Sequence, residues 1–347
     1  MKAKPFLIAA PAALALALSG CGGSTGNTTS GGGNTASGDC SSADVFCVGL
    51  VTDTGTIDDK SFNQAAWEAV KSFEGSGATV KPIETKDPKD YANNIKQFTD
   101  QKYDAVVTVG FLMTEATRTA AEANPNTKFI GVDQFQESDV PNVTGLVFPE
   151  QNAGYAAGYL AGLMTKTNKI GVVLGQEIPP TQNYAKGYEQ GSKAANPKVS
   201  VAKVYHPAGD NAFSDPAWGA GEAKKMLAQG ADFIFGAGGG TGNGAIGEAA
   251  KASGAGESVY CIGVDLDQWN TVPEAQPCLV TSAEKKLTDG TKTLLDQVKD
   301  GSIKGGNFFG KTGLAPYHDF DSKIPADVKT KVDEVIKGLE DESIKVS

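Results

Sequence analysis

Short apolar segments alternate with amphipathic segments along nearly the whole chain, and this alternation limits the possible folds more than any other feature. Regular strand–helix alternation forms parallel sheets that are covered by helices on both faces. Two successive series of such units predict an α/β protein with two doubly wound parallel-sheet lobes. The expected strands are 46–52, 79–85, 104–110, 128–133, 143–148, 169–174, 199–205, 231–237, 259–265, 278–282 and 307–313. The expected helices are 60–74, 89–101, 114–123, 151–165, 183–194, 217–229, 242–253, 284–299 and 325–340.

The two series divide near Val147–Gln151. We therefore expect an N-terminal lobe formed by 45–150 with part of 279–315. The C-terminal lobe is expected to consist of 151–278 with 316–347, because the last segments of the chain are expected to cross back between the lobes.

The N-terminus has the pattern of an export signal. Lys2 and Lys4 precede an apolar stretch, 5–18, that is too short to span a bilayer as a permanent helix. Residues 1–20 are therefore predicted to be a signal peptide.

Cys21 follows Leu18-Ser19-Gly20, and small residues before a cysteine resemble a bacterial lipobox. We expect Cys21 to be lipidated, and 21–44 to form the lipidated N-terminus and a flexible tether, since 22–38 consist almost entirely of Gly, Ser, Thr and Asn. The alternative is an ordinary signal peptide with an incidental cysteine. The lipidated chain would lie on the extracytoplasmic face of the cell membrane.

The charge argues against a nucleic-acid ligand. Removal of the signal peptide would take away two lysines and no acidic residue, so the net charge of −10 would become −12. Nucleic-acid binding requires clustered basic residues that neutralise phosphates.

The remaining cysteines fall into two pairs that are local in the sequence, although four cysteines allow three connectivities. The expected disulfides are Cys40–Cys47 and Cys261–Cys278, in keeping with an exported protein. A metal site is the competing interpretation, but neither pair has C-x-x-C spacing and both histidines lie far away in the sequence. We expect no metal.

Polar residues follow several predicted strands directly. They are Asp53–Asn63, Asp133-Gln134, Gly238–Gly242 and Asp265–Asp267. Each could be a helix cap or a turn. Because ligands of open α/β sheets bind beyond the carboxyl ends of strands, four such segments from both halves of the chain favour a cleft between the lobes.

The first of these segments, DTGTIDDKSFNQ, surrounds Phe62 with hydrogen-bonding groups. Asp59 or Ser61 could cap the helix that follows, and Phe62 could belong to the core. At the first helical turn, however, Phe62 would project towards the cleft. An aromatic ring with the Asn63 amide beside it can stack on a flat base and hydrogen-bond its edge.

The sequence GAGGGTGNGA contains a match to G-x-G-x-x-A at Gly240–Ala245. A dinucleotide site is a weak interpretation, because the match lies deep in the chain and an exported protein has no steady supply of NAD. No lysine of a P-loop follows the glycines. A backbone that approaches a ligand closely is the preferred reading, and a purely structural turn is the alternative.

Catalytic arrangements are scarce. The chain has two histidines and no G-x-S-x-G, so a Ser-His-Asp hydrolase has no candidate residues. Acidic pairs exist at Asp58-Asp59 and Asp265–Asp267, and a nucleoside hydrolase with an acidic Ca²⁺ site built from scattered residues remains an alternative.

Six segments together resemble the basic membrane protein family, bacterial lipoproteins that act as purine nucleoside receptors of ABC importers. The similarity covers the chain from Val45 onwards, and the order and spacing of the segments make it specific. The segments are Asp53–Gln64, Phe129–Gln134, Phe148–Gly162, Gly230–Gly244, Ile262–Gln268 and Thr281–Lys286.

This resemblance implies a type I periplasmic-binding-protein fold, in which three hinge strands join two lobes that close over one ligand. It implies that Phe62 stacks on the purine and that an aromatic of the second lobe stacks on the other face. The second aromatic could be Phe213 or Phe235, and Trp218 is near Phe213 in the sequence.

The hydrogen-bonding residues follow from the same resemblance. Asn63 and Asp133 would face the polar edge of the base, and Asp53 is also expected to bind the ligand. The motif TSAEKK leaves Lys285 or Lys286 in the pocket, and the spacing from Ser282 favours Lys285. The ribose hydroxyls would be held by Gly239, Gly240, Asp265 and Lys285.

The function that the resemblance implies is nucleoside capture and delivery to an ABC permease. We expect a monomer that is not an enzyme, has no cofactor and reaches the membrane through its lipid. The alternatives are a receptor for a sugar or another small polar solute, a nucleoside hydrolase, and a sensor or adhesion lipoprotein.

Overall fold

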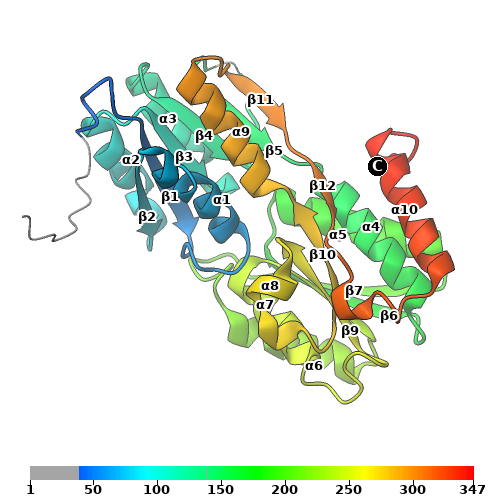
Figure 1. The fold of residues 1–347 in the computed structure, drawn as a ribbon. Helices are drawn as coiled ribbons and strands as arrows, with labels where there is room; N and C mark the ends of the chain where they lie inside the picture. Colours follow the sequence, from blue (N-terminus) through cyan, green and yellow to red (C-terminus); the bar gives the residue numbers. More distant parts are fainter. Residues whose placement is uncertain (1–38, 139) are drawn as a thin grey trace, which may run out of the picture. The chain divides into compact units, whose positions relative to one another are not determined.

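The computed structural model describes residues 39–138 and 140–347. It contains two six-stranded sheets, each covered by helices (Figure 1). The predictions for the signal peptide, for Cys21 and for the tether up to residue 38 lie outside the described residues. No helix in the described ranges has the length and apolarity needed to cross a membrane.

The first sheet has the strand order β11-β5-β4-β3-β1-β2, and all its neighbouring strands are parallel. We call this sheet and its helices the first lobe. β1 and β3 are buried along their whole length, as expected of strands with helices on both faces. The strands are β1 (Cys47–Thr54), β2 (Thr79–Thr85), β3 (Ala105–Val109), β4 (Lys128–Val132), β5 (Val143–Val147) and β11 (Gly306–Phe309).

The second sheet has the order β12-β10-β9-β8-β6-β7, and only the β10–β12 pair is antiparallel. It forms the second lobe with its helices. The strands are β6 (Lys169–Gln176), β7 (Ser200–His206), β8 (Phe233–Ala237), β9 (Tyr260–Asp265), β10 (Leu279–Lys285) and β12 (Thr312–Leu314).

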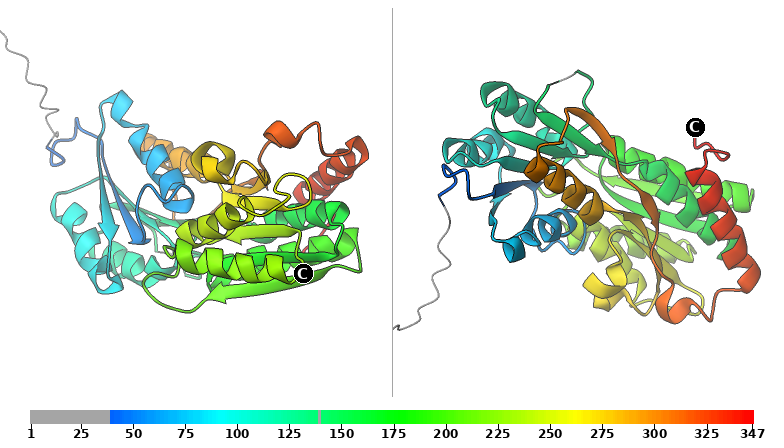
Figure 2. Two further views of the ribbon diagram at one scale, coloured as in Figure 1. Left: turned by 90° about the horizontal axis from the view of Figure 1, so that it is seen from below. Right: turned by 45° about the horizontal axis from the view of Figure 1, so that its top comes forward.

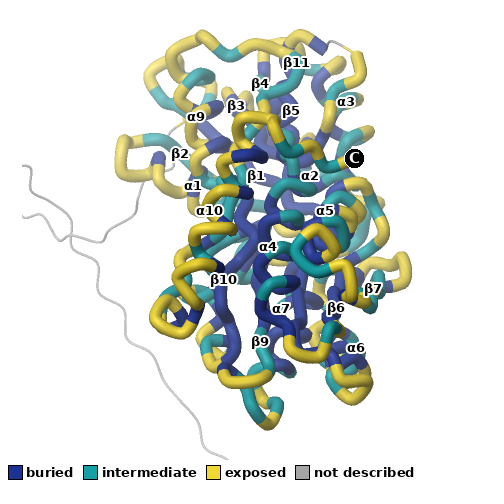
Figure 3. Tube along the Cα trace, turned by 90° about the vertical axis from the view of Figure 1, so that its right-hand side faces the viewer, coloured by how far each residue is buried: buried dark blue, intermediate teal, exposed yellow. Residues whose placement is uncertain are grey.

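Helices lie on both sides of the buried sheets, and the buried strands run between exposed helical surfaces (Figures 2 and 3). The helices are α1 (Phe62–Lys71), α2 (Tyr91–Asp100), α3 (Thr114–Ala123), α4 (Glu150–Met164), α5 (Pro179–Ala195), α6 (Pro216–Ala228), α7 (Gly239–Ala249), α8 (Gln268–Thr271), α9 (Leu287–Asp300) and α10 (Ala326–Glu340). Short 3-10 segments occupy Glu74–Ser76, Pro88–Asp90, Phe111–Met113, Pro273–Ala275 and His318–Phe320. The predicted doubly wound α/β architecture is confirmed.

The chain passes between the lobes after β5, after β10 and after β11. The prediction of one strand at 307–313 is wrong. β11 pairs with β5 of the first sheet, whereas β12 pairs with β10 of the second. Gly310 and Lys311 connect them, and a Cβ on Gly310 would lie 2.2 Å from the Phe148 ring. Only two residues separate β11 from β12, so the sequence reads as a single strand.

The packing of α4 against α5 explains the glycines of the motif NAGYAAGYLAG. α4 and α5 pack so closely that a Cβ on Gly158 would lie 2.1 Å from the Tyr188 carbonyl oxygen, and one on Gly154 would lie 2.4 Å from that of Tyr184. Side chains there would force the helices apart. The close packing positions the N-terminus of α5 at the junction of the lobes.

Two disulfides lie in the described residues. Cys40 is bonded to Cys47, at the start of β1, and Cys261 of β9 is bonded to Cys278, just before β10. These are the pairs that the sequence spacing favours.

Candidate ligand-binding site

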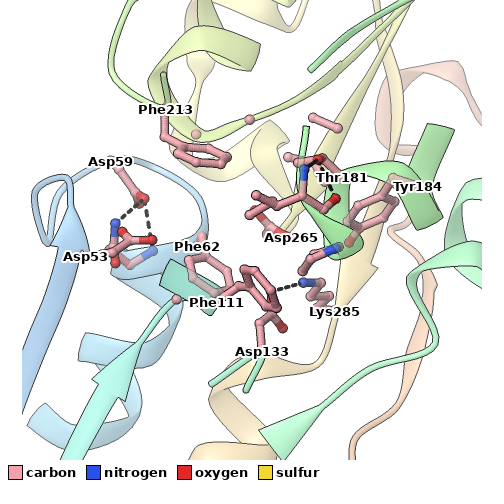
Figure 4. Close-up of a pocket in the computed structure, with 18 residues that line it drawn as sticks. Asp53, Asp59, Phe62, Phe111, Asp133, Thr181, Tyr184, Phe213, Asp265 and Lys285 are labelled. Carbon is pink, nitrogen blue, oxygen red and sulfur yellow. Dashed lines mark hydrogen bonds and ion pairs between the residues drawn. The ribbon is translucent and has the colours of Figure 1, made fainter. Parts of the chain in front are cut away.

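A pocket lies where the carboxyl ends of strands from both sheets meet, as expected of open α/β sheets (Figure 4). The first lobe contributes residues at or after the ends of β1, β3 and β4, and the second contributes residues at or after the ends of β6, β7, β8, β9 and β10. The pocket is lined by Asp53, Asp59, Phe62, Asn63, Gly110, Phe111, Asp133, Ile178, Pro180, Thr181, Tyr184, Phe213, Ala237, Gly238, Gly239, Val264, Asp265 and Lys285.

The cavity measures about 60 Å³ in this conformation. Sites for small molecules usually measure roughly 300–1,000 Å³. A ligand of nucleoside size therefore enters this pocket only when the lobes separate or the lining side chains move.

The structure brings most of the predicted binding residues together. Phe235 and Gly240 are not among the lining residues, although Gly239 is. Those that line the pocket are Asp53, Phe62, Asn63, Asp133, Phe213, Gly239, Asp265 and Lys285.

Three aromatic rings border the pocket. Phe62 begins α1, Phe111 follows β3, and Phe213 belongs to the loop between β7 and α6. Figure 4 shows the ring of Phe213 on the opposite side of the pocket from Phe62 and Phe111. A flat ligand between these rings would contact an aromatic of each lobe.

The other predicted aromatics lie elsewhere. Phe235 is fully buried inside β8, where it packs against Tyr184 and Tyr188 with ring centroids 5.9 and 5.1 Å away. Trp218 packs against His206. Of the two candidates for the second stacking aromatic, the structure therefore places only Phe213 in the pocket, because the side chain of Phe235 points into the core.

Asp59 caps α1. Its carboxylate accepts hydrogen bonds from the backbone N–H groups of Ser61 (2.9 Å), Asn63 (2.9 Å) and Gln64 (3.1 Å). The side-chain amide of Asn63 also donates to Asp59, at 3.1 Å. The Oδ1 atom of Asn63 is buried without a hydrogen-bond partner among the described residues. Asn63 can therefore accept a hydrogen bond from a ligand.

Ser61 has a different role from the capping role suggested as an alternative by the sequence. Its hydroxyl donates to Oδ2 of Asp265 at 2.7 Å and so connects the two lobes. Asp265 ends β9 in a left-handed conformation, with φ of 65°, and Asp133 follows β4 with φ of 60°. Aspartate adopts this conformation more readily than most residues do, and it turns the chain out of each strand at the pocket.

The segment around Lys60 makes further contacts between the lobes. The Lys60 carbonyl oxygen accepts hydrogen bonds from Nε2 of Gln268 (3.1 Å) and from Oγ1 of Thr271 (2.9 Å). Nδ2 of Asn243 donates to the Asp59 carbonyl oxygen at 2.8 Å. These bonds hold the lobes together on one side of the pocket.

Lys285 is a buried cation of the site. Its ammonium group lies 2.5 Å from Oδ2 of Asp133 and 3.2 Å from Oε1 of Glu150, and its side chain is 2% exposed. It also lies 5.2 Å from the centroid of the Phe62 ring. Lys286 instead pairs with Glu284 and its side chain is half-exposed. The structure thus places Lys285 in the pocket and Lys286 outside it.

Burial governs the protonation of the pocket acids. Loss of hydration raises the pKa of Asp133 to about 7, although the nearby Lys285 ammonium opposes this rise. Burial also raises the pKa of Asp53, which the neighbouring Asp59 and Asp133 raise further, and that of Asp265. Burial alone would lower the pKa of Lys285, but the surrounding carboxylates outweigh it and raise that pKa. Lys285 therefore stays charged.

Sequence reasoning missed Phe111, Tyr184 and Glu150. Phe111 directly follows the buried strand β3, so the rule that pointed to Asp133 and Asp265 could also have found it. Tyr184 and Glu150 lie on α5 and α4, and no local pattern distinguishes them from other helical residues. Only the packing of these helices brings them to Lys285.

The glycine segment combines two roles. Gly238 and Gly239 line the pocket, and Gly239 has φ of 54°. Further along α7 the glycines serve packing, since a Cβ on Gly244 would lie 2.0 Å from the Pro216 carbonyl oxygen. α7 begins at Gly239, three residues before the expected start at 242. Its close packing on α6 explains why a glycine occupies position 244, where a stronger helix former would otherwise be expected.

The two histidines lie outside the pocket lining. His206 contacts Asp215 at 3.4 Å, and His318 contacts Asp267 at 2.8 Å. Among the residues that the structure describes, no group of three or more His, Cys, Asp or Glu side chains could hold a metal ion.

Residues 46–310 match the Bmp family, described as "ABC transporter substrate-binding protein PnrA-like". The chain belongs to this family. The predicted resemblance is thereby confirmed, and with it the role of a substrate-binding protein of an ABC transporter.

Relatives support this assignment over most of the chain. A protein of Listeria innocua named "CD4+ T-cell-stimulating antigen" is 33% identical, with all of this chain and 99% of the relative covered. The "ABC transporter nucleoside-binding protein BmpA" of Lactococcus lactis is 32% identical over 74% of this chain and 76% of its own length. A solute-binding protein of an ABC transporter from Aeropyrum pernix K1 shares the fold, with a TM-score of 0.77 at 23% identity, over 86% of this chain and 92% of that chain.

Proposed function

We propose that this family member captures purine nucleosides between its lobes and delivers them to an ABC permease, without catalysing a reaction. The observation that carries this proposal is the pairing of Phe62 and Phe213, aromatic rings from different lobes, across one polar pocket. Two rings can hold a flat base by stacking on both of its faces. The name of the Lactococcus lactis relative supports the same ligand class.

Unpaired acceptors in the pocket are compatible with the N–H groups of a base edge. The Oδ1 atoms of Asn63 and Asp133 are buried and have no hydrogen-bond partner among the described residues. A buried acceptor without a donor costs free energy, which N–H groups of a base edge would recover. These two residues are therefore proposed to read the base, together with Asp53.

The ribose is proposed to lie towards Asp265, Gly239 and Lys285. A carboxylate can accept hydrogen bonds from both hydroxyls of a diol, and Asp265 already accepts one from the Ser61 hydroxyl. The ammonium group of Lys285 can donate to ribose oxygens when the ligand shifts it from Asp133. Neither histidine lines the pocket, and the carboxyl groups that do line it are proposed to bind the ligand and not to activate water.

Membrane attachment is proposed to occur through a lipid on Cys21. The protein would then stay near its permease on the extracytoplasmic face and act as a monomer. The motif before Cys21 and the composition of 22–38 support this arrangement.

Calorimetry of the purified protein with purine nucleosides, free bases and pentoses tests the ligand class. We expect purine nucleosides to bind at least tenfold more tightly than ribose or free bases. Tighter binding of a pentose would replace the proposal with a sugar receptor. Release of free base from a bound nucleoside, followed by chromatography, would replace it with a hydrolase.

A further inference from the structure

A groove of about 700 Å³ adjoins the pocket at the junction of the lobes. We call it the hinge groove and define it by Phe135, Phe148, Glu150, Gln151, Asn183 and Phe309, which lie along its walls. Phe135 is 54% exposed and Phe309 is 69% exposed. They are the two large hydrophobic side chains that are exposed in the described part of the chain, and both line this groove.

The hinge groove is continuous with the ligand pocket. Phe111, Asp133 and Pro180 line both. Figure 4 shows the ring of Phe111 beside Phe62 and near the Lys285–Asp133 pair, where the two spaces meet. A ligand that stacks on Phe62 could therefore extend past Phe111 into the groove.

A buried acceptor stands at this boundary. Asp133 lies with its side chain 5% exposed, and its Oδ1 atom has no hydrogen-bond partner among the described residues. Next to it Glu150 is 4% exposed, and its Oε2 atom accepts a hydrogen bond from Asn183 at 3.0 Å. Asp133 thus offers an acceptor to a ligand N–H group where the pocket and the groove meet.

The charged side chains that line the hinge groove determine which chemical groups can bind there. Its single arginine, Arg118, is already paired with Glu115 at 2.7 Å and with Glu122 at 2.9 Å. The acids Asp133, Glu137 and Glu150 also line the groove. This balance disfavours a phosphate and favours an apolar, aromatic or amine-bearing group.

We propose that the hinge groove holds a substituent on the base, so that the protein accepts purine nucleosides enlarged at the exocyclic amine, N6 of adenosine. A secondary N6 amine keeps one N–H for Asp133 and directs its substituent past Phe111 to Phe135. The inference rests on the proposed nucleoside function, and on Asp133 facing the base edge.

The test compares adenosine with N6-benzyladenosine by calorimetry on the purified full-length protein, its Gln151→Trp variant and its Phe135→Ala variant. Gln151 lines the groove and not the pocket, and its side chain is partly exposed. We expect N6-benzyladenosine to bind the unchanged protein at least as tightly as adenosine. Gln151→Trp should weaken it at least tenfold and Phe135→Ala several-fold, while adenosine changes less than twofold in both variants.

A 5′-benzylthio analogue of adenosine serves as the matched control, and neither variant should affect it selectively. Loss of its binding in Gln151→Trp, with N6-benzyladenosine unaffected, would show the reverse orientation and overturn the inference. Adenosine binding with no binding of N6-benzyladenosine would overturn it as well and leave the nucleoside function intact. If no purine nucleoside binds, the proposed function fails instead.

Discussion

The ammonium group of Lys285 lies 2.5 Å from Oδ2 of Asp133, and this ion pair joins the end of β10 in one lobe to the end of β4 in the other. The two residues are separated by 152 positions in the sequence. Both side chains are almost fully buried, so each charge depends on the other for compensation. The pair therefore couples ligand recognition to contact between the lobes.

Lys285→Met should strongly destabilise the ligand-free protein, because it leaves the carboxylates of Asp133 and Glu150 buried without their cation. Removal of one partner of a buried pair costs about 3–5 kcal/mol. The double variant Lys285→Met/Asp133→Asn should recover part of this loss. Urea unfolding measures the free energy of unfolding of the single and the double variant. Lys286→Met is the control, since loss of that half-exposed side chain should lower the free energy of unfolding by less than about 1 kcal/mol. Equal effects at positions 285 and 286 would contradict the buried pair.

Phe213→Ala and Phe235→Ala should have opposite consequences. Stacking of a base on an aromatic ring contributes about 1–3 kcal/mol, so Phe213→Ala should weaken purine nucleoside binding by about tenfold and leave the melting temperature of the free protein nearly unchanged. Phe235→Ala should lower the free energy of unfolding by about 3–5 kcal/mol, because it opens a cavity in the core. Calorimetry and thermal unfolding separate the two effects. Phe62→Ala should behave like Phe213→Ala, and a large loss of stability there would assign Phe62 to the core.

Thr271→Val should weaken ligand binding about two- to tenfold, because it removes one hydrogen bond to the Lys60 carbonyl oxygen across the lobes. The effect should appear mainly as faster ligand release in stopped-flow measurements. Thr288→Val is the matched control, since that hydroxyl donates to Ala65 within the first lobe. It should lower stability without changing affinity, and equal affinity in both variants would show that the Lys60 contacts do not hold the closed lobes.

Asp59 should make the ligand-free protein less stable as the pH rises from about 4 to about 7. Burial raises the pKa of Asp59 from 3.8 to about 6, although the hydrogen bonds that its carboxylate accepts from backbone N–H groups lower the pKa. The folded protein then holds the proton more strongly than the unfolded chain does, so the contribution of Asp59 is complete below about pH 4 and is lost as the pH passes about 6. A shift of two pKa units corresponds to about 3 kcal/mol.

Asp59→Asn should remove this part of the pH dependence, and urea unfolding at several pH values measures it. Asp53, Asp133 and Asp265 remain in both proteins, so the difference between the two curves reports Asp59 together with its effect on the pKa of the neighbouring Asp53. Parallel curves for the parent protein and Asp59→Asn would show that Asp59 stays ionised at the helix terminus.

Cys21→Ser should release the protein from the membrane fraction, because lipidation requires that thiol. Immunoblotting of fractionated cells measures the distribution. Cys40→Ser with Cys47→Ser is the control, since that disulfide plays no part in anchoring. Unchanged membrane association of Cys21→Ser would contradict a lipid anchor at this position.

The order of strands and helices could be predicted from the sequence because it depends on local patterns. Buried parallel strands such as β3 and β8 are continuous apolar runs, and polar residues such as Asp133 and Asp265 follow directly where the chain leaves a strand. The rule that ligands bind beyond the carboxyl ends of strands therefore identified most of the predicted residues that line the pocket. Phe111 also comes after a buried strand, but an aromatic residue at that position fits the core as well as a binding site.

The tertiary structure decided which side chains meet. Phe213 and Phe235 are both aromatic residues of the second lobe, but the pleat of β8 turns Phe235 into the core while the loop after β7 leaves Phe213 at the pocket. The crossing at Gly310, the Lys285–Asp133 pair and the contact of Ser61 with Asp265 each join residues that are distant in the sequence or belong to different sheets. Local periodicity fixes the face of an element, whereas the partner across the interface depends on how the two sheets pack together.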